Sequence, residues 1–192
     1  MKITPHTALL MIDIQEAFKD IAYWGGSRNN PGAESQIAAL LQAWRQASLP
    51  LFHIRHCSVS PGSPLQDGLP GNAFMEVARP LPGETVISKS ANSAFIGTDL
   101  LTQLQAAGIE AVVVAGFTTD HCVSTTARMA ANLGFQTTVL DDATVAFAKT
   151  GHDGKAFSAE TIHDVSLASL NGEFAEITDT ATLLTQLSAE QV

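Results

Sequence analysis

The sequence predicts an α/β protein with three layers, α/β/α, built on a central parallel sheet of about six strands in a Rossmann-like arrangement. Short apolar runs alternate with segments of helical periodicity along the whole chain. This alternation is typical of a parallel sheet whose right-handed crossover helices cover both faces. The strand candidates are apolar at successive positions, which indicates burial on both faces. With 192 residues, the chain is expected to form a single domain over residues 1–192.

Charge and composition exclude several classes of function. The net charge is −9, so no basic surface is expected to neutralise phosphates and no nucleic-acid partner is predicted. No apolar run approaches a membrane span, and the N-terminus lacks the pattern of a signal peptide. We therefore expect a cytoplasmic protein with no membrane partner. The two cysteines are then expected to be free thiols, with a Cys57–Cys122 bridge as the alternative.

The first apolar run, residues 7–12, leads directly into an acid. Its composition predicts a central strand, and Asp13 falls at the carboxyl end. Open parallel sheets bind their ligands at this edge, which favours a functional role over a capping role. The turn-rich residues 23–31 carry Trp24 and are predicted to be a flexible loop, either an ordinary surface loop or part of a pocket wall.

The next segments predict a helix over residues 31–48 and a strand over 51–56, from the spacing of their apolar residues. His53 and His56 lie three apart on that strand and point to opposite faces, so no shared metal site is expected. His56, at the end of the strand, is a candidate for a polar contact with a substrate. Residues 57–83 are rich in serine, glycine and proline, and loops of this length are usually functional or form an interface.

A third strand is predicted over residues 85–89, with Lys89 at its end and Asn92 in the loop that follows. Lys89 thus repeats the placement of Asp13, directly after an apolar run. The remaining segments predict a helix over 98–107, strands over 135–140 and 174–177, and helices over 158–169 and from 178 onward.

The middle of the chain places a cysteine beyond a buried strand. Val112–Val114 are β-branched and apolar, Gly116 is expected to end the strand, and residues 118–120 are typical helix N-caps. Cys122 is therefore predicted in the first turn of a helix that ends at Gly134. Free N–H groups and the helix dipole favour a thiolate there. The alternative is a small buried residue that packs the helix on the sheet.

Asp13, Lys89 and Cys122 are then expected to meet at one edge of the sheet. Cysteine is a good nucleophile near neutral pH, a carboxylate can accept its proton, and an ammonium can stabilise a developing anion. His121 is a poor base for Cys122, because neighbours in a helix point about 100° apart.

Three blocks of the sequence support a family resemblance. They are residues 9–18, 88–95 and 116–127, in this order, and each contains one of the three candidate catalytic residues. With these blocks the chain resembles the isochorismatase-like cysteine hydrolases, which include nicotinamidases, N-carbamoylsarcosine amidohydrolases and streptothricin hydrolase. The resemblance covers nearly the whole chain.

This resemblance implies a catalytic triad of Asp13, Lys89 and Cys122. It also implies a cis peptide between Phe117 and Thr118, with the amides of Thr118 and Cys122 forming an oxyanion hole. The implied reaction is hydrolysis of an amide or lactam through a thioester on Cys122. The residues expected to contact the substrate are Gln15, Phe18, Trp24, His56, Asn92 and Phe117.

Two features of the resemblance narrow the expected activity. Nicotinamidases carry a metal-binding D-x-H element after the second strand, whereas this chain has His53-Ile-Arg-His56-Cys-Ser, so no metal and no cofactor are expected. True isochorismatases lack the cysteine, so Cys122 speaks against isochorismate. The C-terminal part looks most like the streptothricin-hydrolase-related branch, and the family suggests a homo-oligomer. The alternatives are an isochorismatase-type or ester hydrolase, and a non-catalytic binding or redox-sensing protein on the same fold.

Overall fold

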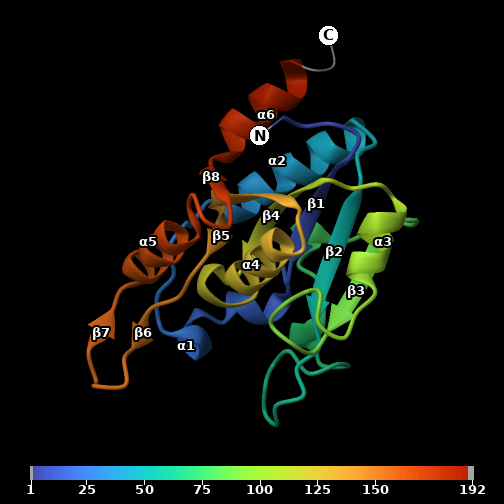
Figure 1. The fold of residues 1–192 in the computed structure, drawn as a ribbon. Helices are drawn as coiled ribbons and strands as arrows, with labels where there is room; N and C mark the ends of the chain where they lie inside the picture. The colour runs from blue at the N-terminus through green and yellow to red at the C-terminus, as the bar shows by residue number, and fades with distance from the viewer. Residues whose placement is uncertain (1, 190–192) are drawn as a thin grey trace.

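The computed structural model describes residues 2–189 and has the predicted three layers (Figure 1). Its centre is a six-stranded parallel sheet with the order β3-β2-β1-β4-β5-β8. The strands are β1 (Thr7–Ile12), β2 (Leu51–His56), β3 (Thr85–Lys89), β4 (Ala111–Phe117), β5 (Gln136–Val145) and β8 (Glu176–Thr178). The prediction of a Rossmann-like α/β fold is confirmed.

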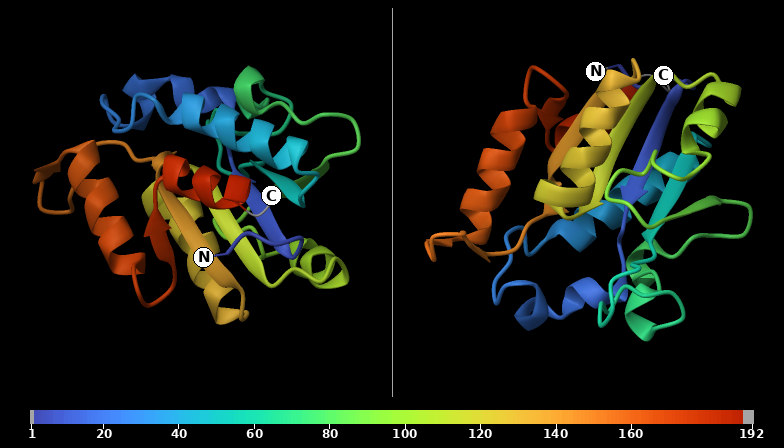
Figure 2. Two further views of the ribbon diagram at one scale, coloured as in Figure 1. Left: turned by 90° about the horizontal axis from the view of Figure 1, so that it is seen from above. Right: turned by 60° about the horizontal axis from the view of Figure 1, so that its bottom comes forward.

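Helices cover both faces of the sheet, as Figure 2 shows from two further directions. One face carries α2 (Ala33–Gln46) and α6 (Thr180–Ala189); the other carries α3 (Leu100–Ala106), α4 (Ser124–Asn132) and α5 (Ala159–Leu170). Successive residues of a strand point to opposite faces, so β1 contributes Leu9 and Met11 to one core and Leu10 and Ile12 to the other.

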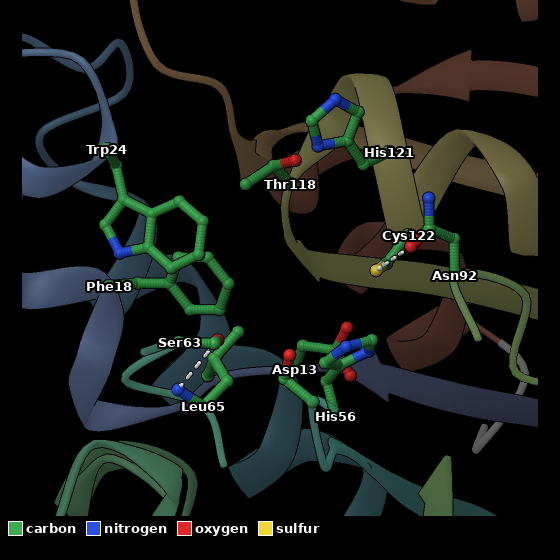
Figure 3. A pocket seen from close by; sticks show the side chains of 11 residues that line it. Asp13, Phe18, Trp24, His56, Ser63, Leu65, Asn92, Thr118, His121 and Cys122 are labelled. Atoms are coloured by element: carbon green, nitrogen blue, oxygen red, sulfur yellow. Dashed lines mark hydrogen bonds between the residues drawn. The ribbon is translucent and has the colours of Figure 1, made fainter. Parts of the chain in front are cut away.

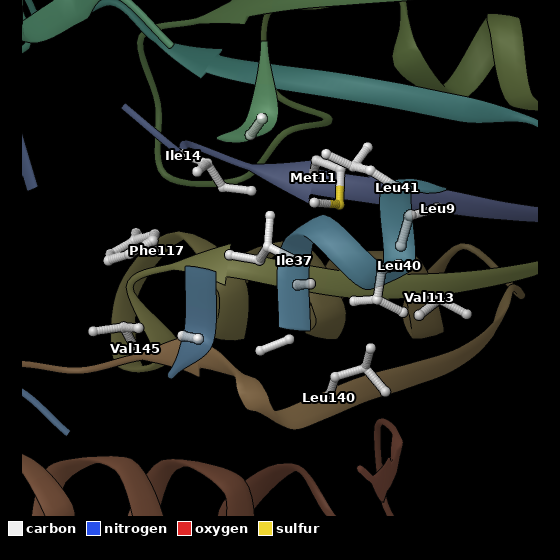
Figure 4. Close-up of a cluster of buried hydrophobic side chains, with 14 of the residues drawn as sticks. Leu9, Met11, Ile14, Ile37, Leu40, Leu41, Val113, Phe117, Leu140 and Val145 are labelled. Atoms are coloured by element: carbon white, nitrogen blue, oxygen red, sulfur yellow. The ribbon is translucent and has the colours of Figure 1, made fainter. Parts of the chain in front are cut away.

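A hydrophobic core between α2 and the sheet attaches this helix to the sheet. Ile37, Leu40 and Leu41 of α2 are spaced to lie on one side of the helix, and all three are buried. They pack on Leu9 of β1 and Val113 of β4 (Figure 4). Burial of each such side chain stabilises the fold by about 1.5–3 kcal/mol.

The strand order reverses between β1 and β4, which are neighbours in the sheet although the chain visits β2 and β3 between them. The connections that leave β1 and β4 therefore run to opposite faces and open a crevice at the carboxyl edge. Asp13 follows β1 at this edge, and the segment that carries Cys122 follows β4.

Two strands extend further than the sequence predicted. β4 continues through Gly116 to Phe117, with an irregularity in its pairing to β5 between Val114 and Gly116. β5 continues past Leu140 through both acids, Asp141–Asp142, to Val145. Asp142 is tolerated because its carboxylate accepts hydrogen bonds from the main chain and hydroxyl of Thr180, at 2.9 and 2.7 Å, where α6 begins.

Gly116 does not end β4; it allows the strand to pass close to β1. It has φ +127°, and a Cβ added there would lie 2.0 Å from the carbonyl oxygen of Ile12. We expect Gly116→Ala to destabilise the protein by about 3 kcal/mol or more, because the obstacle is main chain and cannot rotate away. The control is Gly134→Ala, where φ is +93° but no heavy atom lies within 4 Å. Its expected cost is about 1–2 kcal/mol. Equal losses in urea unfolding would contradict this account.

The remaining segments are short. They are the short helix α1 (Ile21–Trp24), the hairpin β6 (Lys149–Thr150) and β7 (Ala156–Phe157), and short 3₁₀ turns at Glu16–Lys19, Pro70–Asn72 and Glu76–Ala78. Trp24 thus belongs to a helical turn rather than to the flexible loop that was predicted. Within residues 2–189, no helix combines the length and apolar character needed to cross a membrane.

Candidate active site

The structure brings Asp13, Lys89 and Cys122 together at the carboxyl edge of the sheet. Asp13 directly follows β1 and has φ +50°, an uncommon conformation for a residue other than glycine. Lys89 ends β3, two strands away from β1, and its long side chain spans the end of β2. Its Nζ donates to Asp13 Oδ2 at 2.7 Å and to Cys122 Sγ at 3.3 Å. All three residues are buried.

His56 completes the surroundings of the Lys89 ammonium. It ends β2, between the strands that carry Asp13 and Lys89, and its Nδ1 lies 3.0 Å from Lys89 Nζ. An ammonium has three N–H donors and no acceptor, so each donor now has one partner. The geometry requires His56 to accept through Nδ1 and to carry its proton on Nε2. Burial, and then the nearby Lys89 charge, lower the pKa of His56, which favours this neutral form.

Burial dominates the electrostatics of the other two groups. Desolvation raises the pKa of Asp13 above its ordinary value of 3.8, although Lys89 opposes this shift. Desolvation and the Asp13 charge raise the pKa of Cys122 to about 12. Both effects oppose the thiolate that the helix start was expected to favour. They favour the thiol, so attack by Cys122 needs a base.

Asp13 is placed to be that base. One of its carboxylate oxygens and Cys122 Sγ lie within 4.8 Å of each other. Asp13 Oδ2 is taken by Lys89, whereas Oδ1 has no hydrogen-bond partner in the described part of the chain. This free oxygen can accept the thiol proton while the other keeps its contact with the ammonium.

The raised thiol pKa gives a testable pH dependence. We expect alkylation of Cys122 by iodoacetamide to be slow at pH 7 and to rise about tenfold per pH unit up to pH 10, because only the thiolate reacts. Peptide mapping after timed quenches measures the rate at each cysteine separately. A Cys122 rate that levels off below pH 8 would show a lowered thiol pKa and contradict this electrostatic account.

A wide helical turn holds Cys122. Residues Thr119–Val123 form one π-helical turn before α4, so Cys122 lies ahead of that α-helix and not in its first turn as predicted. The N–H groups of His121 and Val123 both donate to the Thr118 carbonyl at 3.1 Å. The peptide bond between Phe117 and Thr118, which enters this turn, is cis. From α5, His163 Nδ1 meets Thr119 Oγ1 at 2.9 Å and fixes the start of the turn.

A cavity of about 140 Å³ opens beside the thiol (Figure 3). Cys122, Asn92, His56 and Asp13 lie on one side of it, and the rings of Phe18 and Trp24 lie on the other. The cavity is lined by Asp13, Phe18, Trp24, His56, Ser58, Ser63, Leu65, Asn92, Thr118, His121 and Cys122. The Cys122 thiol is directed to Asn92 Oδ1, at 4.0 Å.

Four of the six predicted substrate contacts line this cavity: Phe18, Trp24, His56 and Asn92. Gln15 and Phe117 do not, so the structure does not support the contact role predicted for them. The Gln15 amide is fully engaged with main-chain groups, donating to the carbonyls of His56 and Asn72 and accepting from the His56 N–H. Phe117 is fully buried behind Phe18, with ring centroids 5.1 Å apart.

Sequence reasoning missed four lining residues: Ser58, Ser63, Leu65 and His121. The first three belong to the long loop after β2, whose length indicated function but whose sequence has no periodicity to identify the inward positions. His121 was set aside because an α-helical neighbour of Cys122 would point away. The π-helical turn changes that geometry and brings its ring to the cavity rim.

Three residues of this site carry atoms that could bind a metal ion, but the ammonium group of Lys89 lies between them. One ligand atom from each of Asp13, His56 and Cys122 lies within 4.8 Å of the others. Lys89 Nζ bonds all three, at 2.7, 3.0 and 3.3 Å, and so takes the place between them. His53 does not belong to this site, because it points to the opposite face of β2 from His56. Its Nε2 lies 2.8 Å from Glu84 Oε2.

The fold and the site define a three-layer α/β protein with a buried Asp-Lys-Cys group beside a cavity, and comparison with known proteins gives its family. The isochorismatase domain model matches residues 7–182. This chain belongs to the isochorismatase family.

Relatives match over most of the chain. The isochorismatase family protein YrdC of Bacillus subtilis is 42% identical over 177 residues, covering 92% of this chain and 94% of YrdC. The maleamate amidohydrolase of Pseudomonas putida is 34% identical over 150 residues, 69% of each chain. A crystal structure described as a hydrolase of this family from Chromobacterium violaceum has 46% identity and a TM-score of 0.94, covering 98% of this chain and 97% of its own.

Proposed function

We propose that this protein is a metal-independent cysteine hydrolase that cleaves the C–N bond of a small amide through a thioester on Cys122. The observation that carries the proposal is the buried group of Asp13, Lys89 and Cys122 on the wall of a cavity, with a carboxylate oxygen of Asp13 within 4.8 Å of the thiol sulfur. A packing role for Cys122 alone does not explain a buried acid and a buried ammonium at the same place, since burying charges is costly.

In the first half of the reaction, Asp13 Oδ1 accepts the Cys122 proton and Sγ attacks the substrate carbonyl. The carbonyl π electrons move to oxygen and form a tetrahedral oxyanion. The protonated Asp13 then gives its proton to the amide nitrogen, the C–N bond breaks, and the amine or ammonia leaves. Burial favours a protonated Asp13 at this stage, because it already raises the pKa of this carboxyl.

In the second half, Asp13 takes a proton from a water molecule, which attacks the thioester carbonyl. The collapsing intermediate expels Cys122 sulfur, which regains the proton, and the carboxylic acid leaves. Lys89 keeps its contacts with Asp13 and Cys122 throughout and stabilises negative charge on either of them.

Main-chain N–H groups are proposed to hold the oxyanion. In the described structure, neither the Thr118 N–H nor the Cys122 N–H donates a hydrogen bond to another element. Both residues line the cavity. Removing one such donor typically costs about 10²–10³ in kcat, so these two groups can supply a large part of the catalysis.

The comparisons support the type of bond. Relatives of this chain are named nicotinamidase 3, maleamate amidohydrolase and streptothricin hydrolase, and the first two names denote action on an amide. These substrates belong to those proteins. For this chain, the names add weight to amide hydrolysis over ester or vinyl-ether hydrolysis.

The test is a screen for ammonia or amine release over linear and cyclic amides, combined with intact-mass analysis of quenched reactions. We expect turnover to be accompanied by an acyl adduct that maps to Cys122. Turnover of vinyl ethers or esters, with every amide inert, would reject the amide assignment.

A further inference from the structure

The cavity beside Cys122 is small. Its volume of about 140 Å³ is close to that of an apolar cavity of ~150 Å³ that binds benzene in another protein. The part of a substrate that enters is therefore about as large as one six-membered ring. The reacting carbonyl belongs to that part, because Cys122 and Asp13 line the same space.

The wall opposite Cys122 is apolar. The rings of Phe18 and Trp24 are stacked, with centroids 4.6 Å apart and planes at 29°. Trp24 Nε1 donates to the Ala17 carbonyl at 2.8 Å, so its one polar atom is already satisfied. Leu65, nearly fully buried, continues this wall (Figure 3). Burying an apolar group of a substrate against this surface is favourable, and the surface offers the substrate no strong hydrogen-bond donor or acceptor.

The lining of the cavity supplies no unpaired charge. No lysine or arginine is among the described residues that line it. Asp13 is already paired with Lys89, its buried partner at 2.7 Å. Burial lowers the pKa of His56 and of His121, so both rings are neutral at pH 7.

Two cations close to residues of the cavity are paired as well. Lys149 contacts the outer side of His121 but forms an ion pair with the Asp120 carboxylate. Arg28, near the ring of Phe117, is held by both oxygens of Glu34. A substrate carboxylate in this cavity would lose water without gaining a cationic partner, which makes its burial costly.

We propose that the substrate is an uncharged amide with a small apolar acyl group that packs against Phe18, Trp24 and Leu65. This inference rests on the proposed amide hydrolysis and specifies its substrate class. The leaving amine faces Asp13, from which it takes its proton, so the acyl group extends toward the aromatic wall. The class excludes monoamides of dicarboxylic acids, of which maleamate is one.

The experiment compares ligands of equal size in the Cys122→Ala variant, which binds without turnover. The probes are 4-methylpentanamide and succinamate, which share one chain length and differ by an isopropyl group in place of a carboxylate, together with the cation 4-aminobutanamide. Quenching of Trp24 fluorescence reports binding; the other tryptophan, Trp44, is fully buried in the core. Adding Trp24→Phe should remove the signal.

We expect 4-methylpentanamide to bind at least about tenfold more tightly than either charged probe. Equal or tighter binding of a charged probe, or no binding of the neutral one, would overturn the substrate class. A second pair of variants changes Ser63, another residue of the lining. Ser63→Lys, which adds a positive charge, should reverse the preference toward succinamate, and the uncharged Ser63→Met should not. If Ser63→Lys leaves the ratio unchanged, the charge argument is wrong.

Failure of the substrate class is distinguishable from failure of the proposed function. The wild-type enzyme is treated with p-nitrophenyl acetate, an activated ester that needs only the nucleophile and the oxyanion site. An acetyl adduct on Cys122 supports the covalent chemistry whichever amide binds. Absence of an adduct with this ester and with every amide would reject the proposed function, while the binding series still decides the charge preference.

Discussion

Replacing Cys122 by alanine will abolish amide turnover, lowering kcat/KM by on the order of 10⁴-fold or more. Among the residues that line the cavity, Ser58, Ser63 and Thr118 carry the other candidate nucleophiles, and none of their hydroxyls hydrogen-bonds to a base. No other group can therefore form the acyl intermediate. Ammonia release measures the loss, and the acyl adduct seen by mass spectrometry should vanish with it.

The matched control is Cys57→Ala. Cys57 is half-buried next to the site, accepts a 3.7 Å hydrogen bond from Asn72 Nδ2, and does not line the cavity. This variant should keep activity within about threefold of the wild type, because no catalytic contact is lost. Turnover by Cys122→Ala above one-hundredth of the wild-type rate would contradict the covalent mechanism.

The sequence was informative where each strand ends in a chemically distinct residue. Asp13 and Lys89 each follow or close an apolar run, Cys122 follows another, and parallel strands bring such ends to one edge. Residues at such ends can therefore be expected to lie close together even when no long-range pattern in the sequence links them. This is why three residues that are far apart along the chain could be grouped before the structure was known.

The sequence was less informative where a local signal has two meanings. A glycine after three valines is a common strand terminator, but Gly116 is there because β1 leaves no room for a Cβ. Two adjacent acids are typical of a turn, but Asp141–Asp142 continue a strand because Thr180 satisfies one carboxylate. In both cases the deciding contact comes from a distant segment.

The electrostatics of the site could not be predicted from residue types. A cysteine near a helix start suggests a thiolate, yet Cys122 is buried beside a carboxylate, and both effects raise its pKa. The third partner of the Lys89 ammonium, His56, was expected to meet a substrate. Its second role depends on the order of β1, β2 and β3, which sequence periodicity does not give.

Replacing Lys89 by methionine will destabilise the fold, and more so at high pH. Methionine preserves the length of the side chain but leaves Asp13 buried without its ammonium partner. Desolvation already raises the Asp13 pKa above 3.8, and loss of Lys89 raises it further. A carboxyl with a raised folded-state pKa holds its proton more tightly when folded. Stability therefore falls by about 1.4 kcal/mol per pH unit between the unfolded and folded pKa values.

We expect Lys89→Met to cost about 3–5 kcal/mol at pH 8 and clearly less at pH 5, where the carboxyl of Asp13 can be protonated. Urea unfolding at the two pH values measures the difference. The double variant Asp13→Asn/Lys89→Met removes both charges, so it should recover much of the loss and no longer respond to pH. Both variants lose activity, which makes stability the deciding quantity. A cost that is equal at both pH values, or a double variant less stable than Lys89→Met at pH 8, would show that Asp13 carries no unpaired charge after the ammonium is removed.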